Sequence, residues 1–344
     1  MHLLVLGGTR FLGRHLADLA LAQGHRVTLL HRGRSGWDLF PQAEHLIADR
    51  NAGLAVLDGR RFDAVVDTSA YWPRQVQEVA ARLAGRVGHY QMVSTISVYA
   101  EPDAGPPSED APLATLTDPA TEQVTGETYG GLKVLCERAA VAGFGAGRCL
   151  LPRPGLLVGP HDPTERFTWW VRRLLGAAPG SEVLAPGDPA APVQFIDARD
   201  AAAWMLAQAE AGRSGPFNLT GPAAPLTMGT FLEEACRMLA PGSDPPRLDW
   251  VAEDFLLAQG VAPWTELPLW LPRRNAGIHR TDIARALAAG LQCRPLAATL
   301  ADTAAWAQTA PLAATAEGPP RPRTGLAPER EAALLQAWRA AQAG

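Results

Sequence analysis

The fold of this chain is decided by one stretch near its start, Leu3-Leu4-Val5-Leu6-Gly7-Gly8-Thr9-Arg10-Phe11-Leu12-Gly13. An apolar run from His2 to Leu6 ends in the glycines. A helical pattern follows from Phe11 to Ala22, and a second apolar run spans Arg26 to Leu30. Strand, glycine-rich turn, helix and strand within roughly thirty residues are the context that a dinucleotide-binding turn requires. The stretch therefore predicts an α/β chain that begins with a nucleotide-binding unit.

The glycines of this turn have separate expected roles. Gly7 would allow the tight turn, and Gly13 would allow the helix to pack closely on the strand. The helix N-terminus would then present free N–H groups and a positive dipole end to a pyrophosphate. The alternative is an ordinary strand–helix turn. We predict that the cofactor is contacted by Gly7, Thr9, Arg10, Phe11, Leu12 and Gly13.

The end of the second strand favours NADP over NAD. NAD-binding proteins of this kind usually place an Asp or Glu here, on the ribose 2′-hydroxyl. This chain has Arg32-Gly33-Arg34 instead. The guanidinium of Arg32 matches a 2′-phosphate, and Arg34 and Arg10 are further candidates. NADP is therefore the predicted cofactor and NAD the alternative, unless these arginines are only solvated loop residues.

Strands and helices continue to alternate, which predicts a Rossmann-type, doubly wound parallel sheet with helices on both faces. In such sheets ligands bind beyond the carboxyl ends of the strands. A carboxylate at Asp49 could meet the adenine amino group. The residues expected at strand ends on the cofactor are Asp49, Arg50, Ser69 and Ala70, and Thr95 follows the strand predicted at Tyr90 to Val93.

Tyr129-Gly130-Gly131-Leu132-Lys133 carries the candidate catalytic pair. Lys133 is the single lysine among 31 basic residues. On the helix predicted for Glu127 to Val141, residues four apart share a face, so the phenol and the ammonium would lie side by side. A nearby cation lowers the pKa of a phenol toward the neutral range that a catalytic base needs. Tyr-x-x-x-Lys also occurs by chance, so the pair requires support from the rest of the chain.

That support comes from a resemblance to the extended short-chain dehydrogenase/reductases, the NAD-dependent epimerase/dehydratase family. The matching motifs follow the family's order over residues 1 to about 221. They are Gly7 to Gly13 with Arg10 in place of the middle glycine, Ser94-Thr95-Ile96-Ser97-Val98-Tyr99, Tyr129 to Lys133, Arg153 to Pro160, Val193 to Asp200, and Phe217 to Gly221. Such a set is specific for the fold and the cofactor site and much less so for the substrate.

The resemblance implies roles for single residues. Tyr129 would be the general acid/base, Lys133 would hold the nicotinamide ribose, Thr95 would hydrogen-bond the substrate oxygen, and Pro154 would lie at the cofactor. Ile96 and Ser97 replace the Asp-Glu pair of the family's sugar-nucleotide dehydratases, which argues against that elimination chemistry. Gly-Gly-Thr-Arg-Phe resembles a divergent branch that includes reductases and non-catalytic proteins.

The second half departs from the βα rhythm, so a smaller, mainly helical C-terminal substrate lobe is expected. We divide the chain into a dinucleotide-binding domain at 1–160, with returning segments at about 190–221, and a substrate lobe at about 161–189 and 222–310. A proline-rich linker and a C-terminal helix fill 311–344. Val193–Ile196 and Pro216–Leu219 are expected in the main sheet. Candidates to line the substrate pocket are Trp169, Trp170, Trp264, Trp270, Arg166, Arg273 and Arg274.

Bulk properties narrow the function further. A net charge of −4 argues against a nucleic-acid surface. The four cysteines have no zinc-site spacing, so no metal is expected. With no signal peptide and no long apolar run, a cytoplasmic protein without a membrane partner is expected. A homodimer is implied only by the resemblance.

The sequence thus predicts an NAD(P)-dependent oxidoreductase or epimerase of the short-chain dehydrogenase/reductase type. It would transfer hydride at a hydroxyl or carbonyl carbon of a polar, small-molecule substrate that could be nucleotide-sugar-like. The alternative is a non-catalytic NAD(P)-binding regulatory or RNA-associated protein that has kept the fold.

Overall fold

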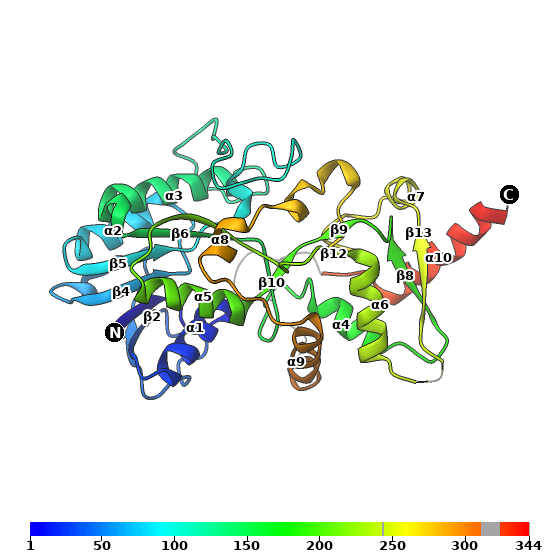
Figure 1. The fold of residues 1–344 in the computed structure, drawn as a ribbon, viewed down its shortest axis with the longest axis horizontal. Coiled ribbons are helices and arrows are strands. Elements are labelled where there is room, and N and C mark those ends of the chain that lie inside the picture. The colour runs from blue at the N-terminus through cyan, green and yellow to red at the C-terminus, as the bar shows by residue number, and fades with distance from the viewer. Residues whose placement is uncertain (243, 311–323, 344) are drawn as a thin grey trace.

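A computed structural model describes residues 1–242, 244–310 and 324–343 of the chain. They form two lobes that lie along the long axis of the molecule (Figure 1). The N-terminal lobe contains the large sheet, and the second lobe is mainly helical and carries the C-terminus. The proline-rich linker predicted from residue 311 lies outside the described residues up to residue 323.

The large sheet has seven strands in the order β11-β6-β5-β4-β1-β2-β3, and every neighbouring pair is parallel. This confirms the predicted doubly wound parallel sheet. The strands are β1 (His2–Leu6), β2 (Arg26–His31), β3 (Glu44–Ile47), β4 (Phe62–Asp67), β5 (Val87–Met92), β6 (Cys149–Pro154) and β11 (Gly215–Leu219).

Helices cover both faces of this sheet (Figure 1). One face carries α1 (Phe11–Ala22) and α5 (Ala198–Glu210), and the other carries α2 (Pro73–Leu83) and α3 (Tyr129–Phe144). Strand β1 shows why the sheet is buried on both sides. Leu3 and Val5 belong to the core beside α1 and α5, whereas Leu4 and Leu6 belong to the core of the opposite face. Each such buried side chain contributes about 1.5–3 kcal/mol to stability.

The C-terminal lobe has its own apolar core, built around the fully buried Phe167, Trp170 and Phe231. A pair of parallel strands, β8 and β13, flanks this core. The elements are α4 (Thr168–Leu175), β8 (Glu182–Pro186), α6 (Met228–Leu239), β13 (Arg247–Val251), α7 (Glu253–Ala258), α9 (Leu296–Thr309) and α10 (Pro328–Ala343). The short helix α8 (Ala284–Ala288) packs instead against β11 of the large sheet.

The segment at Val193–Ile196 does not join the large sheet, contrary to expectation. It splits into β9 (Pro192–Val193), which pairs antiparallel with β12 (Leu226–Thr227), and β10 (Phe195–Asp197), which pairs with β7 (Leu156–Val158). The edge position is taken by β11, which pairs in parallel with β6. These short strands carry the chain from the sheet into the C-terminal lobe. The other expected return, at Pro216–Leu219, is confirmed as β11.

Candidate active site

All seven strands of the large sheet end at one edge because they are parallel, and the predicted site residues follow those ends. Gly7 follows β1, Arg32 follows β2, Ser69 and Ala70 lie just after β4, and Thr95 comes shortly after β5. Asp49 follows β3, and Pro154 is the last residue of β6. The fold therefore brings the residues singled out from the sequence to one edge, where open α/β sheets bind ligands.

The glycine-rich turn has the geometry that its residues suggested. Gly7 has a φ of +92°, in the region that favours glycine, and a Cβ there would lie 2.6 Å from the hydroxyl of Thr68. A Cβ on Gly13 would lie 2.3 Å from the carbonyl oxygen of Gly7. A side chain at Gly7 would therefore collide with the residues that follow β4, and one at Gly13 would push the first turn of α1 away from the end of β1.

The N-terminus of α1 has the features of an anion-binding site. Its N-cap, Arg10, makes no side-chain capping hydrogen bond, and the first turn contains no acidic residue. Helix N-termini normally satisfy these N–H groups with a side chain, water or ligand. The N–H groups around Phe11 to Gly13 are therefore available to a pyrophosphate, which fits a dinucleotide in this turn.

The two residues expected at the adenosine end lie on separate loops. Arg32 is exposed directly after β2. The loop that follows Arg32 folds back on the phosphate turn, since a Cβ on Gly36 would lie 3.2 Å from the carbonyl oxygen of Thr9. Asp49 accepts a hydrogen bond from the backbone N–H of Asn51 at 2.9 Å, which shapes the turn after β3.

Arg50 is held inside the protein and does not extend toward the cleft. Its guanidinium donates to both carboxylate oxygens of Asp67, at 2.7 and 2.8 Å, and to the hydroxyl of Ser69 at 2.8 Å. Asp67 is fully buried, and Tyr90 donates a further hydrogen bond to it. Arg50 thus fixes the end of β4 and orients Ser69.

Helix α3 places Tyr129 and Lys133 next to the turn that carries Thr95. That turn, η2 (Ile96–Val98), begins at Thr95, whose hydroxyl accepts from the N–H of Ser97 at 3.1 Å. The close approach depends on Gly130, where a Cβ would lie 2.1 Å from the carbonyl oxygen of Ser97. The sequence reading did not use this glycine, although a Gly-Gly pair inside a helix is a signal of close packing.

Lys133 is buried and holds two strand ends together. Its ammonium donates to the carbonyl oxygens of Val93 at 2.6 Å and Ala70 at 2.8 Å, and the sulfur of Met92 lies 3.8 Å away. An ammonium has three donors, so two of them are taken by carbonyls. Burial lowers the pKa of Lys133, although the nearby carbonyls favour its charged form.

The expected lowering of the Tyr129 pKa is not found in this structure. Burial of the phenol raises its pKa to about 12, and the neighbouring Tyr71 adds to the rise. The groups that oppose this shift most strongly are Thr95, through a hydrogen bond, and Arg166, through its charge. Lys133 acts less directly than its spacing suggested, because its ammonium bonds to the strand-end carbonyls.

A buried polar network behind the site was missed by the sequence reading. Arg153 forms a two-point ion pair with Glu137 of α3, at 2.9 and 2.7 Å, and also donates to the hydroxyl of Tyr99. Tyr99 in turn donates to Asn218 of β11. This network ties the end of β6 to the helix that carries Tyr129. Arg153 lay within a recognised motif, but only the fold reveals its partner, which is 16 residues away in sequence.

Two buried hydroxyls at the same edge have no hydrogen-bond partner among the described residues. They are Ser94, after β5, and Thr220, after β11. Gly155 lies beside Thr220, and a Cβ on Gly155 would be 2.5 Å from its hydroxyl oxygen. Buried hydroxyls without a partner fit a polar group of a bound cofactor or substrate.

Only some of the predicted pocket residues of the C-terminal lobe line a cavity. Trp170 is fully buried in the core, where its indole N–H donates to the carbonyl oxygen of Pro268. Trp270 and Arg273 line a cavity of about 270 Å³. Trp264 lies under the guanidinium of Arg166, whose central carbon is 5.4 Å from the ring centre. Of the four tryptophans, Trp270 alone is among the residues lining this cavity.

Within residues 1–242, 244–310 and 324–343, no group of three or more His, Cys, Asp or Glu side chains is arranged to hold a metal ion. In the same described part of the chain, no helix is long and apolar enough to cross a membrane.

Comparison with known families gives one extended match. The sequence model of the NAD dependent epimerase/dehydratase family matches residues 3–219. The matched region contains the glycine turn, Thr95, Tyr129, Lys133 and Pro154.

Individual relatives are distant. The chloroplast stem-loop binding protein of 41 kDa b of Arabidopsis thaliana is 28% identical over 124 residues, which are 31% of this chain and 32% of that protein. The bifunctional pinoresinol-lariciresinol reductase of Forsythia intermedia is 38% identical over 66 residues, 19% of this chain and 21% of that protein. The chain thus matches a third or less of the length of these two proteins.

Similarity in structure extends much further. UDP-glucuronic acid 4-epimerase from Bacillus cereus, solved in complex with NAD, superimposes with a TM-score of 0.64 at 16% identity. The alignment covers 90% of this chain and 97% of the epimerase. At this identity the likeness establishes the fold, and it includes the C-terminal lobe that the family match leaves out.

Proposed function

Since this chain belongs to the NAD dependent epimerase/dehydratase family, we propose that it is an NAD(P)-dependent enzyme that transfers hydride at a hydroxyl or carbonyl carbon. The observation that carries the proposal is the arrangement of three side chains at one edge of the sheet. Tyr129 and Lys133 lie one helical turn apart on α3, and the hydroxyl of Thr95 lies close enough to the phenol of Tyr129 to oppose the rise of its pKa. Tyr129 would exchange the hydroxyl proton, and Thr95 would hydrogen-bond the substrate oxygen.

The cofactor supplies or accepts the hydride, and the chain's own residues orient it. The N–H groups of the turn from Gly7 to Gly13 would bind the pyrophosphate. The donor of Lys133 that is not bound to Val93 and Ala70 would be offered to a ribose hydroxyl. Arg32 supports NADP as the preferred form, since no acidic side chain occupies the end of β2.

The test is Tyr129→Phe, which removes the proton-transferring oxygen and keeps the ring. Alcohols and aldehydes would be screened by the absorbance of the reduced nicotinamide. Turnover of any active compound should fall by roughly 10²- to 10⁴-fold, the usual contribution of a general acid/base. NADP binding, followed by calorimetry, should be retained.

A second measurement separates a reductase from an epimerase. An epimerase reduces and reoxidises one cofactor in each turnover, so the purified protein would carry nucleotide that exchanges slowly. A reductase would release its cofactor after each cycle. Mass spectrometry of the protein as purified, followed by a chase with added NADP, distinguishes the two.

The chloroplast stem-loop binding relative supports one alternative, a non-catalytic protein that binds dinucleotide and RNA. Under that alternative Tyr129→Phe would leave every detectable activity unchanged while NADP still bound, and a stem-loop RNA would bind in a mobility-shift assay. The net charge of −4 counts against it.

A further inference from the structure

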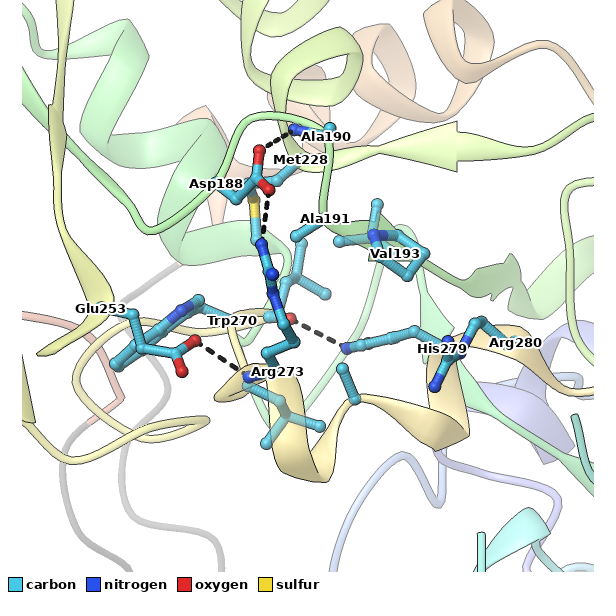
Figure 2. A pocket seen from close by; sticks show the side chains of 14 residues that line it. Asp188, Ala190, Ala191, Val193, Met228, Glu253, Trp270, Arg273, His279 and Arg280 are labelled. Atoms are coloured by element: carbon cyan, nitrogen blue, oxygen red, sulfur yellow. Dashed lines mark hydrogen bonds and ion pairs between the residues drawn. The ribbon is translucent and has the colours of Figure 1, made fainter. Parts of the chain in front are cut away.

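The C-terminal lobe contains a cavity that the reaction chemistry does not by itself explain. Its volume is about 270 Å³. It lies between the loop before β9, the start of α6 and the segment that follows α7 (Figure 2). The residues that line it are mostly apolar, and they include Ala190, Ala191, Pro192, Val193, Met228, Leu269, Trp270, Leu271 and Ala276.

This cavity lies one short turn away from the catalytic helix. The turn is η5 (Gly277–Arg280). On one side, Ile278 packs against the cluster that contains Ile96, next to Thr95, and Val134, next to Lys133. From the same turn, His279 lines the cavity. A substrate whose reacting carbon lies at Thr95 and Tyr129 could therefore extend into the cavity.

A second set of contacts, through two aromatic rings, connects the surroundings of Tyr129 to the cavity. The guanidinium of Arg166 lies over Trp264, and Trp264 contacts the ring of His279 at a centroid distance of 5.7 Å. Arg166 is also one of the charges that act on Tyr129. Arg166, Trp264 and His279 thus form a series of neighbouring side chains between the surroundings of Tyr129 and the wall of the cavity.

The charged groups of the cavity compensate one another. Arg273 reaches across it, and its guanidinium donates to Asp188 at 2.9 Å while its backbone N–H donates to Glu253 (Figure 2). Arg280 is the other cation that lines the cavity, so two arginines face two carboxylates and the formal charge is zero.

The histidine in the wall adds neither charge nor a polar group to the cavity. One ring nitrogen of His279 accepts from the N–H of Gln194 at 3.1 Å, and the other donates to the carbonyl oxygen of Leu269 at 2.9 Å. Burial lowers the pKa of His279 to about 4, so the ring is neutral at physiological pH. With both nitrogens engaged, the ring offers the cavity only its carbon atoms.

We infer that the cavity binds an uncharged aryl group of the substrate, and that a nucleoside diphosphate is not its ligand. A diphosphate requires several charge-assisted donors, and here it would have to displace Asp188 from Arg273 and then face two carboxylates. An apolar cavity of about 150 Å³ is known to bind benzene, so about 270 Å³ is enough for a substituted ring. Trp270 would contact such a ring face to edge or by offset stacking.

That the aryl group belongs to the substrate of hydride transfer rests on the proposed function. Binding of an aryl group in the cavity does not, so the test measures binding alone. Full-length protein with NADP bound would be titrated with cinnamyl alcohol in a calorimeter, with glucose and UDP as comparison ligands. Cinnamyl alcohol should bind in the millimolar range or tighter, glucose should not bind, and UDP should neither bind nor compete. Ala191→Trp, which fills the cavity, should weaken cinnamyl alcohol binding at least about tenfold, or about 1.4 kcal/mol.

The matched control is Ala178→Trp, an exposed alanine of the same lobe that does not line the cavity. It should bind cinnamyl alcohol as the wild type does. Retained NADP affinity and an unchanged Tm show that each variant is folded. If Ala191→Trp does not fold, Ala190→Trp at the exposed rim makes the same test.

Three outcomes overturn the inference. They are no binding of cinnamyl alcohol to the wild type, equal binding to the filled and unfilled proteins, and UDP binding that competes with the alcohol. None of them bears on hydride transfer, which Tyr129→Phe tests separately.

Discussion

The ammonium of Lys133 donates a hydrogen bond of 2.6 Å to the carbonyl oxygen of Val93, the residue that follows β5 on the way to Thr95. The only lysine of the chain thus connects α3, which carries Tyr129, to the edge of the sheet. A buried cation that bonds only to neutral groups is expensive to desolvate. Its presence there is explained best by a ligand that uses it.

Replacing Lys133 by Met should weaken cofactor binding while leaving the stability of the protein nearly unchanged. The variant loses the hydrogen bonds to Val93 and Ala70 but also the desolvation of a buried charge, so unfolding free energy should change by less than about 1 kcal/mol. NADP should bind about tenfold or more weakly, which corresponds to about 1.4 kcal/mol. Calorimetry and denaturant unfolding measure the two effects. Arg138→Met, an exposed change on the same helix, should alter neither.

In the protein without bound cofactor, the phenol of Tyr129 should lose its proton only at high pH. Burial raises its pKa to about 12 from 10. Because the folded state favours the neutral phenol, this contribution to stability is complete below pH 10 and is lost as the pH rises toward 12. The phenolate absorbance of wild type minus Tyr129→Phe measures it. A bound NADP⁺ should lower the midpoint through its positive ring, and a higher midpoint would contradict the assigned role.

The buried pair of Arg50 and Asp67 should carry more stability than any exposed pair. Although burial favours the neutral acid, the Arg50 charge holds the pKa of Asp67 below its usual range. Arg50→Met would leave a buried carboxylate unpaired and lower the unfolding free energy by about 3–5 kcal/mol. The contribution is present above the unfolded pKa of about 3.9 and is lost as the pH falls through the lower folded value.

The control for this change is Arg60→Met. Arg60 pairs with Glu44 at 2.7 Å, but both side chains are about one-third exposed, so the change should be below about 1 kcal/mol. Denaturant unfolding at neutral and acidic pH compares the two variants. Equal effects would show that burial does not distinguish the pairs.

Cofactor preference should depend on Arg32. Arg32→Ala should weaken NADP binding by about tenfold or more, because charge-assisted hydrogen bonds contribute about 1.5–3 kcal/mol. NAD affinity should stay the same, since NAD has no 2′-phosphate. Arg26→Ala, at the opposite end of the same strand, should change neither affinity. If wild-type protein binds NAD as tightly as NADP, the role given to Arg32 is wrong.

A pair of histidines should make the loop after β2 sensitive to pH. The N–H of Gly33 donates to His31, the His31 and His45 rings share a hydrogen bond of 2.8 Å, and His45 bonds the carbonyl oxygen of Phe40. Burial and the neighbouring His45 lower the pKa of His31 from 6.5. The stabilisation is therefore complete above pH 6.5 and is lost as the pH falls below it.

Hydrogen–deuterium exchange at residues 33–40, corrected for the intrinsic rate, would measure this loosening. Exchange of these amides should increase as the pH falls below 6.5. In His45→Asn the loop should exchange fast at every pH, whereas His25→Asn, near the C-terminal end of α1, should behave as the wild type. Exchange that does not respond to pH in the wild type would contradict the histidine mechanism.

The sequence by itself determined the parallel sheet and the positions of its main candidate site residues. Gly7, Gly13 and Thr95 could be placed because each follows a predicted strand, and parallel strands end at one edge. The Tyr129–Lys133 spacing placed both residues on one helical face. These features depend on local periodicity and on chain order, which a sequence shows directly.

Only the tertiary structure decided which partners these side chains have. Arg50 was expected at the cofactor but bonds to Asp67, and Lys133 bonds to strand-end carbonyls rather than acting directly on Tyr129. Such pairings join residues from separate strands and helices, and burial then sets their pKa values. The cavity at Trp270 also required the fold, because its walls come from separate segments between residues 188 and 280, an arrangement for which no local pattern exists.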